Sequence, residues 1–133
     1  MIYLDSCLVI YLVEQHARWG ETIARLVEQE ATLGFAISPL VKCECLVGPL
    51  KSGNAILQQD YLEVFSEFAL LDMSEPIYLH AAELRAHFGL KLPDALHLAC
   101  AQHHRCEEMW TNDDRLIRFS AGMARNILAP GIC

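Results

Sequence analysis

Four acidic residues lie in apolar or turn-like stretches rather than in charged surface runs. They are Asp5, Glu44, Asp94 and Asp113. Acids with such neighbours are expected to be partly buried, and a partly buried anion requires a cation, hydrogen-bond donors or a proton. If the fold brings the four together, we expect them to form a metal site. Carboxylates without histidine suit one or two Mg²⁺ or Mn²⁺ ions better than zinc.

The elements that must position these acids alternate along the chain. Short apolar runs predict strands at Ile2–Leu4, Phe35–Ile37, Leu70–Leu71, Glu108–Thr111 and Asn126–Leu128. Helical spacing and capping signals predict helices capped by Ser6 and running to about Glu14, at Arg18–Glu30, from Ser38-Pro39 to near Gly48-Pro49, at Ala55–Phe68, at Glu75–Phe88 ending at Gly89, at Leu92–His103 and at Asp113–Phe119. This alternation predicts an α/β protein with a mostly parallel sheet of about four to five strands and helices on both faces.

That architecture predicts where the acids lie. Asp5 and Asp113 follow strands, so they belong at the carboxyl edge of the sheet, where open α/β sheets place their sites. Asp94 falls in the first turn of a helix, where the dipole favours an anion. Glu44 lies about two turns into a helix that starts at the same edge. The four are therefore expected to converge.

The composition fits one globular domain spanning residues 1–133. The net charge of −7 argues against binding nucleic acid by phosphate neutralisation alone, although bound divalent ions would reverse much of the local field. The N-terminal residues lack a signal-peptide pattern, and the longest uncharged stretch, Ser6–Val13, is shorter than the ~20 residues of a membrane span. We therefore expect a cytoplasmic protein whose six cysteines are free thiols.

Four segments, taken in order, resemble the motifs of PIN domains, and especially of the VapC-type ribonuclease toxins of type II toxin–antitoxin systems. They are Ile-Tyr-Leu-Asp5-Ser, Ser38-Pro-Leu-Val-Lys-Cys-Glu44-Cys, Gly-Leu-Lys-Leu-Pro-Asp94-Ala-Leu-His-Leu-Ala and Trp-Thr111-Asn-Asp113-Asp-Arg-Leu. The similarity implies a PIN-like three-layer fold and a Mg²⁺- or Mn²⁺-dependent endoribonuclease. The four acids match the catalytic and metal-binding positions of the family. Ser6 and Thr111 match hydroxyl positions that border the site, and Asp114 is a neighbouring alternative to Asp113.

The resemblance also implies partners. They are an RNA substrate, with transfer RNA as one option, a small antitoxin protein and a second copy of the chain in a homodimer. Lys91 and Arg115 are the basic residues nearest to the motif acids and are candidates for RNA contact. Two other functions stay open: a PIN-like RNA-binding or regulatory module with little catalysis, and a metal-dependent phosphatase of small phosphates.

Each acid also has a purely structural explanation. Asp5 could cap a helix together with Ser6, Asp94 could interact with a helix dipole, and Asp113 could be a turn residue. Glu44 has the weakest such explanation. His97, one turn after Asp94, either supports the site or is satisfied within the core.

A competing zinc site would use cysteine and histidine ligands at the end of the same helix. The residues are Cys100, His103, His104 and Cys106. Their short spacing makes a buried cysteine with surface histidines the better interpretation.

Overall fold

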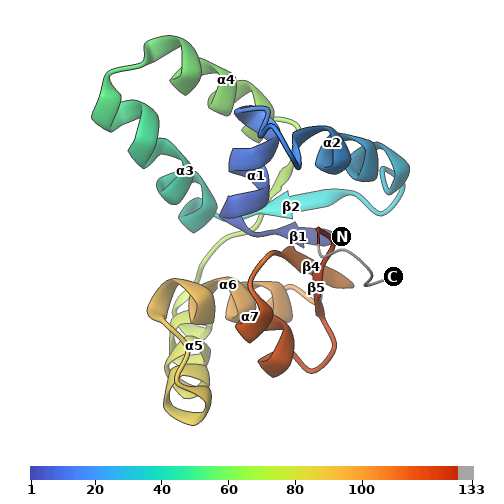
Figure 1. Ribbon diagram of the computed structural model, residues 1–133. Coiled ribbons are helices and arrows are strands. Elements are labelled where there is room, and N and C mark those ends of the chain that lie inside the picture. Colours follow the sequence, from blue (N-terminus) through green and yellow to red (C-terminus); the bar gives the residue numbers. More distant parts are fainter. Residues whose placement is uncertain (129–133) are drawn as a thin grey trace.

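A single parallel sheet organises the chain. The computed structural model describes residues 1–128, and its five strands follow the spatial order β3-β2-β1-β4-β5 (Figure 1). The strands are β1 (Ile2–Leu4), β2 (Phe35–Ile37), β3 (Ala69–Leu70), β4 (Glu108–Thr111) and β5 (Ala124–Asn126). Every neighbouring pair is parallel. All carboxyl ends therefore meet at one edge, as predicted.

Seven helices cover the two faces of the sheet within these residues. They are α1 (Ser6–Val13), α2 (Gly20–Gln29), α3 (Pro39–Ser52), α4 (Ala55–Phe65), α5 (Glu75–Phe88), α6 (Leu92–His103) and α7 (Asp114–Phe119). Helices α1 to α4 pack together on one face, whereas α5, α6 and α7 lie on the other (Figure 1). The result is the predicted three-layer α/β architecture.

The central strand β1 and helix α6 form the middle of the core. All three residues of β1 are buried, which matches a strand flanked by two others and covered on both faces. Helix α6 is buried continuously from Ala95 to Ala101, so its side chains are apolar or small around most of its circumference. Asp5 and Asp94 are attached to these two elements, and a rigid core therefore carries both carboxylates.

Two helix boundaries differ from the sequence prediction. The first helix is capped by Asp5, whose side chain accepts a hydrogen bond from the Ser6 backbone N–H, so Ser6 is already helical. Helix α3 does not stop near Pro49 but continues to Ser52. A proline inside a helix costs one hydrogen bond, and here its ring is buried. The helix ends where Gly53 takes a left-handed φ of 68°.

Smaller shifts affect several other elements, and helix α2 (Gly20–Gln29) is shorter than the predicted Arg18–Glu30. Helix α4 ends at Phe65 rather than Phe68, β3 begins one residue earlier than predicted, and β5 lies two residues earlier. The register of β5 explains its shift, because Ala124 is buried opposite Met109. Within residues 1–128, no helix combines the length and the apolar character needed to cross a membrane.

Candidate metal centre

Asp5 is held at the end of the central strand by two short hydrogen bonds. Its Oδ1 accepts the Ser6 backbone N–H at 2.7 Å, and its Oδ2 accepts the Thr111 hydroxyl at 2.7 Å. The residue is 8% exposed. Because one bond holds each carboxylate oxygen, the side chain is oriented without any ligand.

Thr111 connects Asp5 to Asp113. Strand β4 pairs with β1, and its last residue, Thr111, is fully buried. Its Oγ1 donates to Asp5 and also accepts the Asp113 backbone N–H at 3.0 Å. Asp113 in turn caps α7 by accepting the Arg115 N–H at 2.9 Å. The Thr-x-Asp spacing thus links two of the predicted acids through one hydroxyl.

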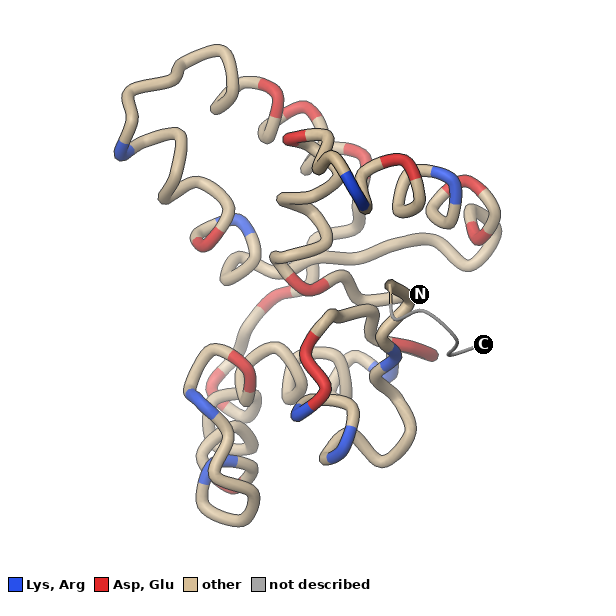
Figure 2. The backbone as a smooth tube through the Cα atoms, viewed as in Figure 1, with Lys and Arg blue, Asp and Glu red and all other residues tan. Residues whose placement is uncertain are grey.

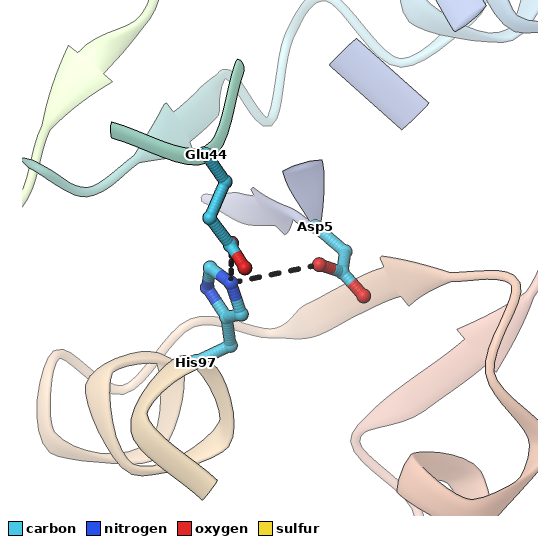
Figure 3. A group of neighbouring side chains, drawn as sticks. All are labelled: Asp5, Glu44 and His97. Atoms are coloured by element: carbon cyan, nitrogen blue, oxygen red, sulfur yellow. Dashed lines mark hydrogen bonds and ion pairs between the residues drawn. The ribbon is translucent and has the colours of Figure 1, made fainter. Parts of the chain in front are cut away.

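Glu44 reaches the site from helix α3. The helix starts at Ser38, whose side chain accepts the Val41 N–H, and Glu44 follows almost two turns later. Its Oε1 lies 2.5 Å from His97 Nε2, and the same nitrogen lies 3.7 Å from Asp5 Oδ1 (Figure 3). Asp5, Glu44 and His97 each offer one atom within 4.8 Å of the others.

The pKa of Glu44 reflects this contact. Burial raises the pKa, but the hydrogen bond with His97, together with the one from the Ser6 hydroxyl, outweighs burial and leaves the pKa below its usual value. Glu44 is therefore a carboxylate at neutral pH.

Asp94 lies in the first turn of α6 and experiences the opposite balance. Burial, and after it the negative charges of Asp113 and Asp5, raise its pKa, and Lys91 opposes them only partly. Asp94 and Asp113 do not belong to the tight group formed by Asp5, Glu44 and His97.

The remaining predicted residues lie around or outside this group. Asp114 accepts a bond from Asn126 Nδ2 at 3.4 Å on the first turn of α7, and it lines a separate cavity with Leu26 and Trp110. That position favours Asp113 over Asp114 as the fourth acid. The Ser6 hydroxyl is 3.5 Å from Asp5 Oδ1.

The alternative zinc ligands do not gather. Among residues 1–128, the three-residue group around Asp5 is the one cluster with metal-ligand geometry. Cys100 and Cys106 are buried, and burial raises the pKa of both thiols, which disfavours thiolate ligands. His104 Nε2 is 2.9 Å from the Asp72 carbonyl oxygen.

Three further residues, His97, Tyr3 and Ser38, contact the site or support it from the core. His97 is 1% exposed and contacts two of the acids. Behind it, the Tyr3 hydroxyl lies 2.6 Å from His97 Nδ1 and 2.8 Å from Ser38 Oγ. The spacing Asp94-x-x-His97 was the available signal, whereas Tyr3 in an apolar strand gave none.

The donor set fits a hard divalent cation. Asp5 follows β1, Glu44 lies in α3, Asp94 lies in the first turn of α6 and Asp113 follows β4; burial and the charges of Asp113 and Asp5 raise the pKa of Asp94. Oxygen ligands of this kind suit Mg²⁺ or Mn²⁺. Figure 2 shows acidic positions near the junction of the two helical layers and basic positions in both layers.

The fold and site define an α/β protein whose parallel sheet carries an acidic centre at its carboxyl edge. The chain belongs to the PIN domain family, whose pattern matches residues 2–122. This confirms the family indicated by the four sequence motifs. A comparison with curated proteins found no match.

Solved structures share this fold over nearly the whole chain. A toxin–antitoxin complex from Klebsiella pneumoniae is 26% identical with a TM-score of 0.78, covering 96% of this chain and 98% of that chain. VapBC2 from Rickettsia felis, bound to a promoter DNA fragment, is 23% identical with a TM-score of 0.74, covering 95% and 98%. VapC20 from Mycobacterium tuberculosis, a sarcin–ricin loop cleaving toxin, is 13% identical with a TM-score of 0.73, covering 91% and 94%.

Proposed function

We propose that this chain is a divalent-metal-dependent endoribonuclease and the toxin of a toxin–antitoxin pair. The observation that carries the proposal is the group of carboxylates at one sheet edge. Within it, Asp5 and Glu44 both lie close to His97 Nε2. Membership of the PIN family, a family of nucleases, supports hydrolysis of phosphodiester bonds.

We assign the four acids different roles in metal binding and catalysis. We propose Asp5 and Asp94 as the direct ligands. Both oxygens of Asp5 are already oriented by hydrogen bonds. The pKa of Asp94 is raised, and a bound cation would offset the cost of ionising this carboxyl group. Asp113 would bind the ion directly or through water. Glu44 would bind the ion or orient the attacking water as a hydrogen-bond acceptor, because its lowered pKa keeps it ionised. A bound divalent ion would polarise the phosphate and lower the pKa of water.

Two basic side chains near the acids, Lys91 and Arg115, are candidates for contact with the RNA backbone. Arg115 Nη2 donates to the Gly89 carbonyl at 3.1 Å, which ties α7 to the turn that carries Lys91. Lys91 immediately precedes α6, three residues before Asp94. We propose that Lys91 and Arg115 contact phosphates next to the scissile bond and offset the net charge of −7 locally.

The α3–α4 hairpin supports the proposed protein partners. Large apolar side chains are exposed there, namely Val47, Leu50, Ile56 and Leu62. Exposed apolar groups on one hairpin favour association with a second copy or with an antitoxin. The similarity to the Klebsiella toxin–antitoxin complex supports the same assignment. Co-expression with a short neighbouring reading frame, followed by mass measurement of the complex, tests both partners.

Cleavage of RNA by the purified chain tests the proposed function. Transfer RNA and a sarcin–ricin loop oligonucleotide are the substrates to compare, with Mg²⁺, with Mn²⁺ and with chelator. We expect cleavage that requires the metal and is lost in the Asp5→Asn and Asp94→Asn variants. Asp113→Asn should also lose activity, whereas Asp114→Asn, its matched neighbour, should retain it.

Other outcomes identify the alternatives. RNA binding without cleavage under all metal conditions would favour a binding or regulatory module. Turnover of a small phosphate ester without RNA cleavage would favour a phosphatase.

A further inference from the structure

A buried chain of hydrogen bonds extends from the sheet edge into the core. It runs from Glu44 through His97 and Tyr3 to Ser38, and it ends at the Val41 backbone N–H. Tyr3 and Ser38 are fully buried, and His97 is 1% exposed. Three polar side chains in such a place are costly unless each is satisfied.

Resting on the proposed function, we propose that His97 is a positioning residue: its Nε2–H holds the Glu44 carboxylate in place, and the imidazole is not itself a metal ligand. Asp5, Glu44 and His97 form a group that would otherwise suit a three-ligand metal site. The arrangement of protons along the buried chain distinguishes the two roles.

The neutral imidazole with its proton on Nε2 satisfies each group in the chain. Ser38 accepts from the Val41 N–H and donates its hydroxyl to Tyr3, Tyr3 donates to His97 Nδ1, and Nε2–H donates to Glu44. A ligating imidazole would need its Nε2 lone pair free and its proton on Nδ1. Tyr3 would then donate to Ser38, whose own buried hydroxyl proton would lose its acceptor among the described residues.

Fixing the imidazole on both sides also fixes Glu44. The ring is held by Tyr3 at Nδ1 and packs against the Tyr3 ring at 5.7 Å between centroids. Glu44 has a side chain that is 31% exposed and would otherwise sample several rotamers. One short bond from a rigid donor at 2.5 Å places its carboxylate beside Asp5. Partners of this type commonly change metal affinity 10- to 100-fold when removed.

The first test reads the tautomer of His97 directly. Nitrogen-15 spectra of the histidine rings, recorded on the full chain without metal and with saturating Mg²⁺, report which ring nitrogen carries the proton. We expect Nε2 to be protonated in both samples. An Nε2 without a proton in the Mg²⁺ sample would identify His97 as a ligand and overturn the proposal.

The second test measures Mn²⁺ affinity by calorimetry in two substitutions at the same position. His97→Leu keeps the bulk and removes the donor, and roughly 10- to 100-fold weaker binding is expected. His97→Gln places an amide N–H near the former Nε2 and should recover most of that loss. Wild-type affinity in His97→Leu, or equal losses in both variants, would refute the positioning role.

Tyr3→Phe provides a third variant should His97→Leu fail to fold. It removes the hydroxyl that donates to Nδ1, so we expect the Nδ1 signal to shift and Mn²⁺ to bind more weakly. An unchanged ring spectrum would contradict the proton arrangement. If the wild-type chain bound no Mn²⁺ and cleaved no RNA, the proposed function would fail, whereas the metal-free spectrum would still decide whether Nε2–H faces Glu44.

Discussion

Replacing Thr111 with valine removes the hydroxyl that links two of the acids. The two side chains have nearly the same shape, and Thr111 is fully buried, so packing is conserved. The substitution leaves the Asp5 Oδ2 atom without its 2.7 Å donor and the Asp113 N–H without its acceptor.

The expected cost follows from these two bonds. A hydrogen bond to a charged group contributes about 1.5–3 kcal/mol, and a neutral one about 0.5–1.5 kcal/mol. Thr111→Val should therefore lower the free energy of unfolding by about 2–4.5 kcal/mol. Thr111→Ser keeps the hydroxyl and loses one buried methyl group, which costs about 1 kcal/mol.

Urea unfolding at pH 7 without divalent ions measures both variants. We also expect Thr111→Val to bind Mn²⁺ more weakly than Thr111→Ser, because only the valine variant releases the Asp5 carboxylate. A valine variant within about 0.5 kcal/mol of wild type, or a serine variant equally destabilised, would refute the assigned role of the hydroxyl.

Three further predictions concern charge, metal and backbone. Asp94→Asn should stabilise the metal-free chain at pH 7 by less than about 1 kcal/mol, because it removes a half-exposed, screened anion. The folded pKa of Asp94 is raised, so its ionised form lowers stability above both pKa values, and this cost disappears as pH falls through the folded pKa. Urea titrations from pH 7 to 4 should therefore show that the difference in unfolding free energy between wild type and Asp94→Asn shrinks. Mg²⁺ at 100 times its dissociation constant should raise the free energy of unfolding of wild type by about 2.7 kcal/mol, and a similar rise in Asp5→Asn would remove Asp5 from the metal site. Gly53→Ala should lower the free energy of unfolding by about 1 kcal/mol, because Gly53 has a left-handed φ of 68°. Metal-dependent cleavage should stay intact, since a Cβ there meets no atom within 4 Å. Lost cleavage in a folded variant would show that Gly53 does more than cap the helix.

Local signals were sufficient for the elements next to the site. The strands at 2–4, 35–37 and 108–111 have the predicted bounds, because each is a short apolar run with strong breaks on both sides. Gly89 ends α5 as predicted, with a left-handed φ of 68°. Helix α3 exceeded its prediction because burial of Pro49 in the packed hairpin outweighs the loss of one hydrogen bond.

The site itself was only partly accessible to sequence reasoning. Strand ends and a helix start predicted that Asp5, Asp94 and Asp113 lie at one edge, and in the structure Asp5 and Asp113 follow β1 and β4 while Asp94 lies in the first turn of α6. The contact between Glu44 and His97 joins residues 53 positions apart, and no local pattern encodes it. The role of Tyr3 could not be predicted for a different reason. A tyrosine in a buried strand gives the same sequence pattern whether its hydroxyl bonds within the core or to a site residue.

Anomalous scattering from crystals soaked in Mn²⁺ tests the central claim most directly. We expect a manganese peak at the carboxyl edge of the sheet, bound by carboxylate oxygens of Asp5 and Asp94, with Glu44 directed toward it and His97 Nε2 outside bonding distance. A peak at Cys100 and His103, or no peak at this edge in a protein that cleaves RNA with Mn²⁺, would contradict it.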